Sequence, residues 1–113
     1  PPKKELELSQ EYENFLKNYY LNNLSKINNL VKTKGSELIL ITQFISTNHW
    51  LSFYLKKINK YTLEFCKLKK IKCIDLNIHF KKDNNKLFYD GIHTDPSGSS
   101  LVGEFIALEF NKF

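Results

Sequence analysis

The sequence predicts a layered α/β fold, because stretches with helical periodicity alternate with short apolar runs. Helical patterns cover about residues 9–34, 50–70 and 95–110, and the apolar runs are ELILIT at 37–42 and KCIDL at 72–76. Two strands joined through a helix form a right-handed parallel crossover. The 113 residues contain no internal repeat and match the size of one domain, so we expect a single domain over residues 1–113.

The first helix has clear signals at both ends. Ser9 is a suitable N-cap, Lys32 and Lys34 complement the negative end of the helix dipole, and Gly35 suits a left-handed C-cap. Apolar residues recur between these ends at spacings of three and four: Tyr12, Phe15, Leu16, Tyr19, Tyr20, Leu24, Ile27, Leu30 and Val31. They form the apolar side of the predicted helix.

The run at 37–42 predicts a strand buried on both faces of a parallel sheet, followed by a polar loop. A second helix runs from about Trp50 to Lys70, with apolar residues on or near one stripe: Phe53, Tyr54, Ile58, Tyr61, Phe65 and Leu68. The second strand, 72–76, is shorter, and residues 77–89 have the composition of a loop. These elements give the order helix, strand, helix, strand.

The last helix begins near Asp95 or Ser97, with Pro96 at a position where a missing N–H costs nothing. Its inward residues are expected to be Leu101, Val102, Phe105, Ile106, Leu108 and Phe110. Two strands alone leave an edge of the apolar run ELILIT unpaired, so the sheet requires further strands. The chain also begins Pro1-Pro2 and contains no Met. We therefore expect it to be the later portion of a larger α/β domain, or to associate with a part that supplies the rest.

The composition excludes several classes of protein. Hydrophobic residues make up 42% and charged residues 26%, as in an ordinary soluble globular protein. No apolar run approaches the roughly 20 residues that span a bilayer, so no membrane span is expected. The net charge of +5 comes from 17 lysines, with no arginine, scattered among acidic residues. Nucleic-acid binding requires a clustered basic face and is therefore not predicted.

The two cysteines, Cys66 and Cys73, have neither a metal-ligand spacing nor a CxxC spacing. Each lies in an apolar stretch. We expect two reduced thiols that are buried as small hydrophobic side chains. A disulfide between them is the alternative.

The stretch FYDGIHTDPSG at 88–98 places Asp90 three residues before His93, in the loop that follows the second strand. Ligands bind in such loops of open α/β sheets. A carboxylate at this spacing can accept the imidazole Nδ1–H, which leaves Nε2 free as a base, and Gly91 eases the turn between them. The alternatives are an ordinary Asp-Gly turn and a solvated histidine. No third ligand stands at a recognisable interval, so no metal site is predicted.

The stretch LFYDGIHTDPSGSSLVGEFIALEF, which follows KCIDL, resembles the final block of the SGNH hydrolases, also called the GDSL family. INNLVKTKGSELILITQF resembles the helix and strand that precede that block, and the similarity covers roughly residues 9–113. The resemblance implies the C-terminal part of a flavodoxin-like three-layer α/β/α parallel sheet. It also implies a serine ester hydrolase that needs no cofactor, with His93 as general base and Asp90 as the carboxylate that orients it.

The nucleophilic serine of this family lies in a Gly-Asp-Ser motif near the N-terminus, and a Gly and an Asn from two middle blocks help to form the oxyanion hole. None of these motifs is present in the chain. We therefore expect half an active site, completed by residues upstream of Pro1, the N-terminal part of the same domain, or by a separate polypeptide. The expected substrate is a small-molecule, carbohydrate or lipid ester. The alternative is a non-catalytic, truncated or degenerate relative that serves as a binding or assembly module.

Other polar residues near the presumed site are ambiguous. Gln43 follows the first strand and is a candidate substrate-binding residue, and His49 and Trp50 lie in the loop after it. The structural alternatives are a hydrogen bond at the strand end, a solvated loop side chain and a ring that anchors the second helix. Thr94 and Ser97 are expected to serve as turn and cap residues.

Overall fold

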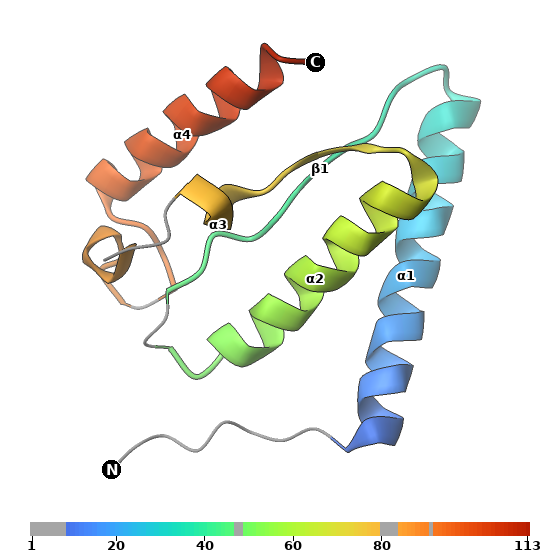
Figure 1. Ribbon diagram of the computed structural model, residues 1–113, viewed down its shortest axis with the longest axis horizontal. Helices are drawn as coiled ribbons and strands as arrows, with labels where there is room; N and C mark the ends of the chain where they lie inside the picture. Colours follow the sequence, from blue (N-terminus) through green and yellow to red (C-terminus); the bar gives the residue numbers. More distant parts are fainter. Residues whose placement is uncertain (1–8, 47–48, 80–83, 91) are drawn as a thin grey trace.

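The computed structural model describes residues 9–46, 49–79, 84–90 and 92–113, and for His79, Asn84 and Asn85 it describes the backbone alone. The elements, in chain order, are α1 (Gln10–Thr33), β1 (Ile39–Ile41), α2 (Ser52–Lys69), β2 (Lys72–Ile74), α3 (Leu76–His79), the 3₁₀ turn η1 (Asn84–Leu87) and α4 (Pro96–Phe110) (Figure 1). The predicted mixed α/β character and the order of the long helices and strands are confirmed. The prediction of a loop over 77–89 is wrong where α3 and η1 form.

β1 and β2 form a two-stranded parallel sheet in which Ile39 pairs with Lys72 and Ile41 with Ile74. Both strands are shorter than predicted, and β2 ends where side chains take over the backbone hydrogen bonds just beyond Ile74. Leu76 N–H donates to Thr42 Oγ1 at 2.9 Å, and Asn77 N–H donates to Asp75 Oδ1 at 3.0 Å. These bonds turn the chain into α3 and end the ladder.

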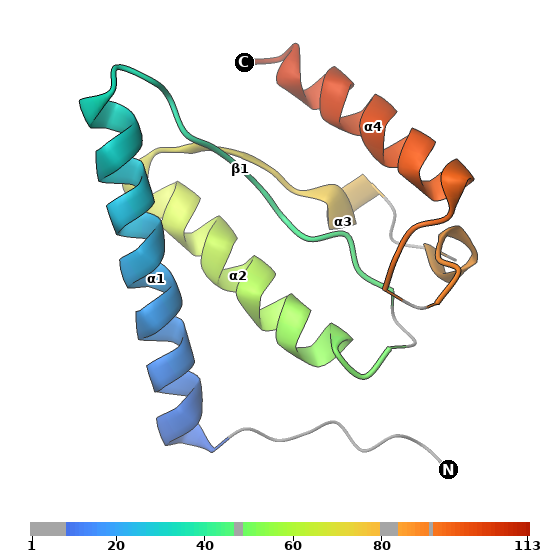
Figure 2. The ribbon, with the colours of Figure 1, turned by 180° about the vertical axis from the view of Figure 1, so that it is seen from behind.

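The helices lie on both sides of the strand pair. α2 contacts β2 and α1, whereas α4 contacts β2 from the other side. Figures 1 and 2 show α2 between α1 and the strands, with α4 apart from both helices. The fold is therefore mixed α/β, and the described residues contain two sheet strands rather than a complete three-layer sheet.

One cluster of the hydrophobic core lies between the strands, α4 and the turn before it, and further buried residues lie on α1, on α2 and after β1: Leu24, Ile45, Tyr61, Phe65 and Cys66. The buried members of the cluster are Phe44, Ile74, Leu76 and Phe88, and the partly buried side chains packed against them are Ile39, Leu87, Val102, Phe105 and Ile106. The rings of Phe44 and Phe88 lie 5.0 Å apart. This contact joins the segment after β1 to the segment that carries Asp90 and His93.

The ends of α1 are as predicted, but its apolar side is not covered. Ser9 Oγ accepts from Tyr12 N–H at 3.2 Å, and Gly35 has a φ of 73°. Only Leu24 and Asn28 of this helix are buried, and several apolar residues of its predicted stripe are exposed: Tyr12, Phe15, Tyr19, Ile27 and Leu30. Periodicity reports that a helix has an apolar face, not that a partner covers it.

The long helices also depart from the predicted burial elsewhere. Leu68 of α2 and three of the expected inward residues of α4 are exposed: Leu101, Leu108 and Phe110. α1 and α2 nevertheless contact each other through polar groups. Tyr20 Oη and Thr62 Oγ1 lie 2.5 Å apart, and Lys57 Nζ donates to Glu13 Oε1 at 2.8 Å.

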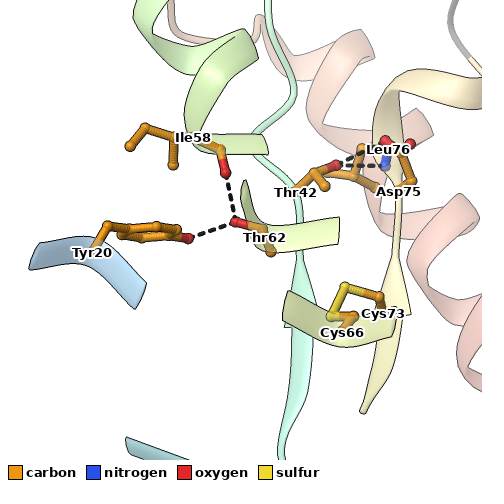
Figure 3. The surroundings of a disulfide bond; sticks show 8 residues. All are labelled: Tyr20, Thr42, Ile58, Thr62, Cys66, Cys73, Asp75 and Leu76. Carbon is orange, nitrogen blue, oxygen red and sulfur yellow. Dashed lines mark hydrogen bonds between the residues drawn. A yellow bond between two sulfur atoms is a disulfide. The ribbon is translucent and has the colours of Figure 1, made fainter. Parts of the chain in front are cut away.

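The prediction of two reduced thiols is wrong, because Cys66 and Cys73 form a disulfide (Figure 3). Lys70 adopts a left-handed conformation, with a φ of 55°, at the end of α2. The chain therefore reverses, and β2 passes the last turn of the helix with the Cα atoms of the two cysteines 6.1 Å apart. This separation is typical of a disulfide. The bond ties the end of α2 to the middle of β2.

Candidate active site

A tight turn between η1 and α4 carries Asp90 and His93. Phe88 and Thr94 form an isolated antiparallel bridge, Tyr89 N–H donates to His93 O at 3.1 Å, and Asp95 N–H donates to Leu87 O at 2.7 Å. Two short antiparallel arms therefore enclose the residues between Tyr89 and His93. Gly91, which was predicted to ease this turn, lies outside the described residues.

The Asp90 carboxylate contacts both the backbone of the turn and the imidazole. Its Oδ1 accepts from the backbone N–H of His93 at 2.6 Å and of Ile92 at 2.9 Å. Its Oδ2 lies 2.5 Å from His93 Nδ1. The hydrogen bonds from the His93 backbone, the His93 ring and the Ile92 backbone hold the pKa of Asp90 well below its ordinary value. The carboxylate is therefore ionised at neutral pH.

Because Asp90 is ionised, it determines which nitrogen of a neutral His93 ring carries the proton. An ionised carboxylate only accepts hydrogen bonds, so Nδ1 carries the proton that it donates to Asp90. Nε2 is then the unprotonated nitrogen, which is the arrangement that a general base requires. The predicted contact between the Asp90 and His93 side chains is present in the structure.

A cleft of ≈ 750 Å³ opens beside this histidine. It lies where β1 ends, between the segment after that strand, the Asp90–His93 turn and the first half of α4. Its lining residues are Ile41, Thr42, Gln43, Phe44, Leu76, Tyr89, Ile92, His93, Thr94, Ser99, Val102 and Gly103. Asp90 is absent from this lining, so it supports the histidine rather than facing the cleft.

Gln43 lines the same cleft as His93, as expected for a substrate-binding residue. Its backbone is fixed by two asparagines. Asn59 accepts from Gln43 N–H and donates to Gln43 O, both at 2.8 Å, and Asn77 Nδ2 also donates to Gln43 O at 2.8 Å. Both the N–H and the C=O of Gln43 are hydrogen-bonded, so its backbone is held in place while its side chain is exposed.

His49 and Trp50 do not line this cleft. His49 Nδ1 accepts from Leu51 N–H at 3.1 Å, and the ring centroids of His49 and Trp50 lie 5.7 Å apart. These contacts belong to the segment that leads into α2. The half-buried His49 is bonded to the chain rather than solvated, and Trp50 is 53% exposed, so its ring does not anchor α2 by burial. The side chain of His79 lies outside the described residues.

Tyr89, Thr94 and Ser99 also line the cleft, and none of them was predicted to be part of the site. The Tyr89 ring stacks on the His93 ring, and Thr94 Oγ1 lies 2.6 Å from Ser99 Oγ. Tyr89 directly precedes Asp90, so its position in the sequence was the available signal. The contact between Thr94 and Ser99 spans the start of α4, and no sequence periodicity reports it.

α4 starts at the predicted place, but its N-cap is Asp95, and Ser97, an expected cap residue, lies inside the first turn of the helix. Asp95 Oδ1 accepts from Gly98 N–H at 2.7 Å, and Pro96 occupies the first turn. Gly98 is buried, and a Cβ added there would lie 2.4 Å from the carbonyl oxygen of Leu87. A glycine at this position therefore allows α4 to approach Leu87, the last residue of η1.

Comparison of the chain with protein-family models, with curated proteins and with solved structures found no match. Within the described part of the chain, no group of three or more His, Cys, Asp or Glu side chains is arranged to hold a metal ion. None of the helices in that part has the length and apolar character needed to cross a membrane.

Proposed function

We propose that this chain is the C-terminal section of an SGNH-type serine ester hydrolase, in which His93 is the general base and Asp90 orients it. The contact of 2.5 Å between Asp90 Oδ2 and His93 Nδ1, beside a cleft at the end of a parallel strand, carries the proposal. The residues around it support the same assignment, because the pair directly precedes the last helix, as in the family that the sequence resembles.

The proposed reaction follows from the free nitrogen of His93. Nε2 takes the proton of a serine hydroxyl while the serine oxygen attacks the ester carbonyl carbon. The protonated ring then gives that proton to the departing alkoxide as the bond from carbon to the leaving oxygen breaks. Water then attacks the carbonyl carbon of the acyl-enzyme. His93 takes a proton from the water and gives it to the serine oxygen as the bond from carbon to that oxygen breaks. Asp90 remains ionised throughout and stabilises the imidazolium that forms in each half-reaction.

The serine and the oxyanion-hole donors are proposed to come from outside this chain, since it contains no Gly-Asp-Ser motif. The same missing part would supply further strands. β1 pairs only with β2 among the described residues, and Ile41, at the end of β1, is 43% exposed. A flavodoxin-like three-layer sheet, completed by the N-terminal part of the domain, would cover this strand.

The cleft supports a small ester as substrate, with a carbohydrate or lipid as the alcohol or acyl component. Apolar side chains on one part of its wall, Ile41, Phe44 and Val102, suit the alkyl portion of an acyl group. Gln43 and Thr94 supply polar groups for the remaining oxygens.

The test is hydrolysis of p-nitrophenyl acetate by a protein in which this chain is joined to, or mixed with, the segment carrying the Gly-Asp-Ser motif. We expect His93→Ala to lower kcat by roughly 10² to 10⁴, the value of a general base. His49→Ala is the matched control, because that histidine lies in the segment before α2, outside the cleft, and its loss should leave kcat unchanged. Full activity of the His93→Ala protein would remove His93 from the mechanism.

The second candidate is a non-catalytic scaffold that binds esters or assembles with another protein. The absence of a Gly-Asp-Ser motif from the sequence favours it. It predicts no hydrolysis of p-nitrophenyl acetate even after the missing segment is restored.

A further inference from the structure

Few groups hold the His93 ring, although a general base must be held in a defined orientation. Its side chain is 64% exposed, so core packing does not determine its orientation. The contact with Asp90 is made at one atom, Nδ1, and does not by itself hold the plane of the ring. A general base requires its other nitrogen to point at the reacting proton, so a second restraint on the ring plane matters.

Tyr89 supplies a restraint of this kind. The centroids of the Tyr89 and His93 rings lie 5.8 Å apart, and their planes meet at 18°. The backbone strengthens the arrangement, because Tyr89 N–H donates to His93 O at 3.1 Å and holds the two residues side by side. The Tyr89 side chain is itself 71% exposed, so burial in a core does not account for its position.

We propose that Tyr89 is a positioning residue that fixes the plane of the His93 imidazole through its ring face. This inference rests on the proposed role of His93 as general base. Tyr89 holds the ring at the tilt at which Nδ1 keeps its contact with Asp90, so both the Nδ1–H tautomer and the direction of Nε2 depend on the two residues together. The stacked face is the active feature, and the phenol hydroxyl is dispensable.

The first test is nuclear magnetic resonance of the chain of residues 1–113, labelled with ¹⁵N and held at a pH where the ring is neutral. Long-range ¹H–¹⁵N correlations report which nitrogen of His93 carries the proton. We expect Nδ1–H in the wild type and in Tyr89→Phe, and a mixture of Nδ1–H and Nε2–H in Tyr89→Ala. The backbone amide signals of Ile92 and His93 show whether the turn itself survives.

Tyr19→Ala is the matched control. Tyr19 is also an exposed tyrosine that stacks on a neighbouring ring, that of Phe15, but it lies on α1 and does not line the cleft. Its loss should leave the His93 signals unchanged. An unaltered Nδ1–H signal in Tyr89→Ala, with the turn intact, would overturn the proposal, and so would a mixture in Tyr89→Phe.

The second test is kinetic and uses the protein that also contains the Gly-Asp-Ser segment. Misplacement of a catalytic group lowers the rate constant of the chemical step, so Tyr89→Ala should lower kcat roughly tenfold or more with little change in KM, and Tyr89→Phe should retain kcat. A rise in KM alone would make Tyr89 a substrate contact and overturn the positioning role. If no variant hydrolyses esters while the tautomer responds to Tyr89→Ala, the proposed function fails and the positioning role stands.

Discussion

At the scale of single residues, Asp90 contributes to both the fold and the proposed chemistry. One carboxylate oxygen accepts two backbone N–H groups of the turn, and the other contacts the histidine ring. The spacing of Asp90 and His93 was sufficient to predict their contact, because the interaction spans only three residues and closes within one turn. The stacked position of Tyr89 could not be predicted, since it depends on the path of the turn.

The lowered pKa of Asp90 leads to a dependence of stability on pH. The pKa of Asp90 is lower in the folded chain than its ordinary value of 3.8, which applies to the unfolded chain. The ionised carboxylate therefore stabilises the fold fully at pH values above 3.8, and this stabilisation is lost as the pH falls below 3.8. Melting temperatures of the wild type and of Asp90→Asn should differ most above about pH 5 and converge in more acidic solution. A difference that persists unchanged to pH values near 2 would contradict this origin.

Gly98 and Gly103 form a matched pair within α4. A Cβ at Gly98 would meet the Leu87 carbonyl at 2.4 Å, whereas a Cβ at Gly103 would have nothing within 4 Å. We expect Gly98→Ala to lower the free energy of unfolding by about 1–3 kcal/mol through overpacking. Gly103→Ala should raise it by about 0.5–1 kcal/mol, because alanine favours a helix interior. Urea unfolding measures both changes, and equal effects would contradict the close approach of α4 to Leu87.

At the scale of elements, local signals predicted the helices well. Ser9, Gly35 and Asp95 mark helix ends in the structure as they do in the sequence, because capping involves neighbouring residues alone. Strand lengths and burial depend on distant partners, which explains why both strands are shorter than expected and why most of the α1 stripe is exposed. The disulfide was only the alternative in the sequence analysis, because it depends on the reversal of the chain at the left-handed residue Lys70, which residue spacing does not report.

The Cys66–Cys73 disulfide should stabilise the junction of α2 and β2. It closes a loop with a sequence separation of 7, and a loop of that size corresponds to about 2–3 kcal/mol of unfolding free energy in the chain-entropy model. Urea unfolding with and without reductant measures this loss. A variant with both cysteines replaced by alanine should be insensitive to reductant, and a wild type equally insensitive would argue that the bond contributes no stability.

At the scale of the whole molecule, much of the apolar side of α1 is exposed and the described sheet contains two strands. The described residues provide one cleft that contains both Gln43 and His93, as predicted from their positions after β1 and β2. The larger domain and its further strands stay a prediction, because the described residues contain two strands and do not show the rest of a three-layer sheet.

A double-mutant cycle in the protein that includes the Gly-Asp-Ser segment tests the central claim, that Asp90 acts through His93, most directly. Residues that act as a unit have non-additive effects on catalysis. Asp90→Asn and His93→Ala should each lower kcat for p-nitrophenyl acetate by roughly 10² to 10⁴, and the double variant should be no slower than His93→Ala alone. Losses that multiply in the double variant would show that the two residues act independently and would contradict the account.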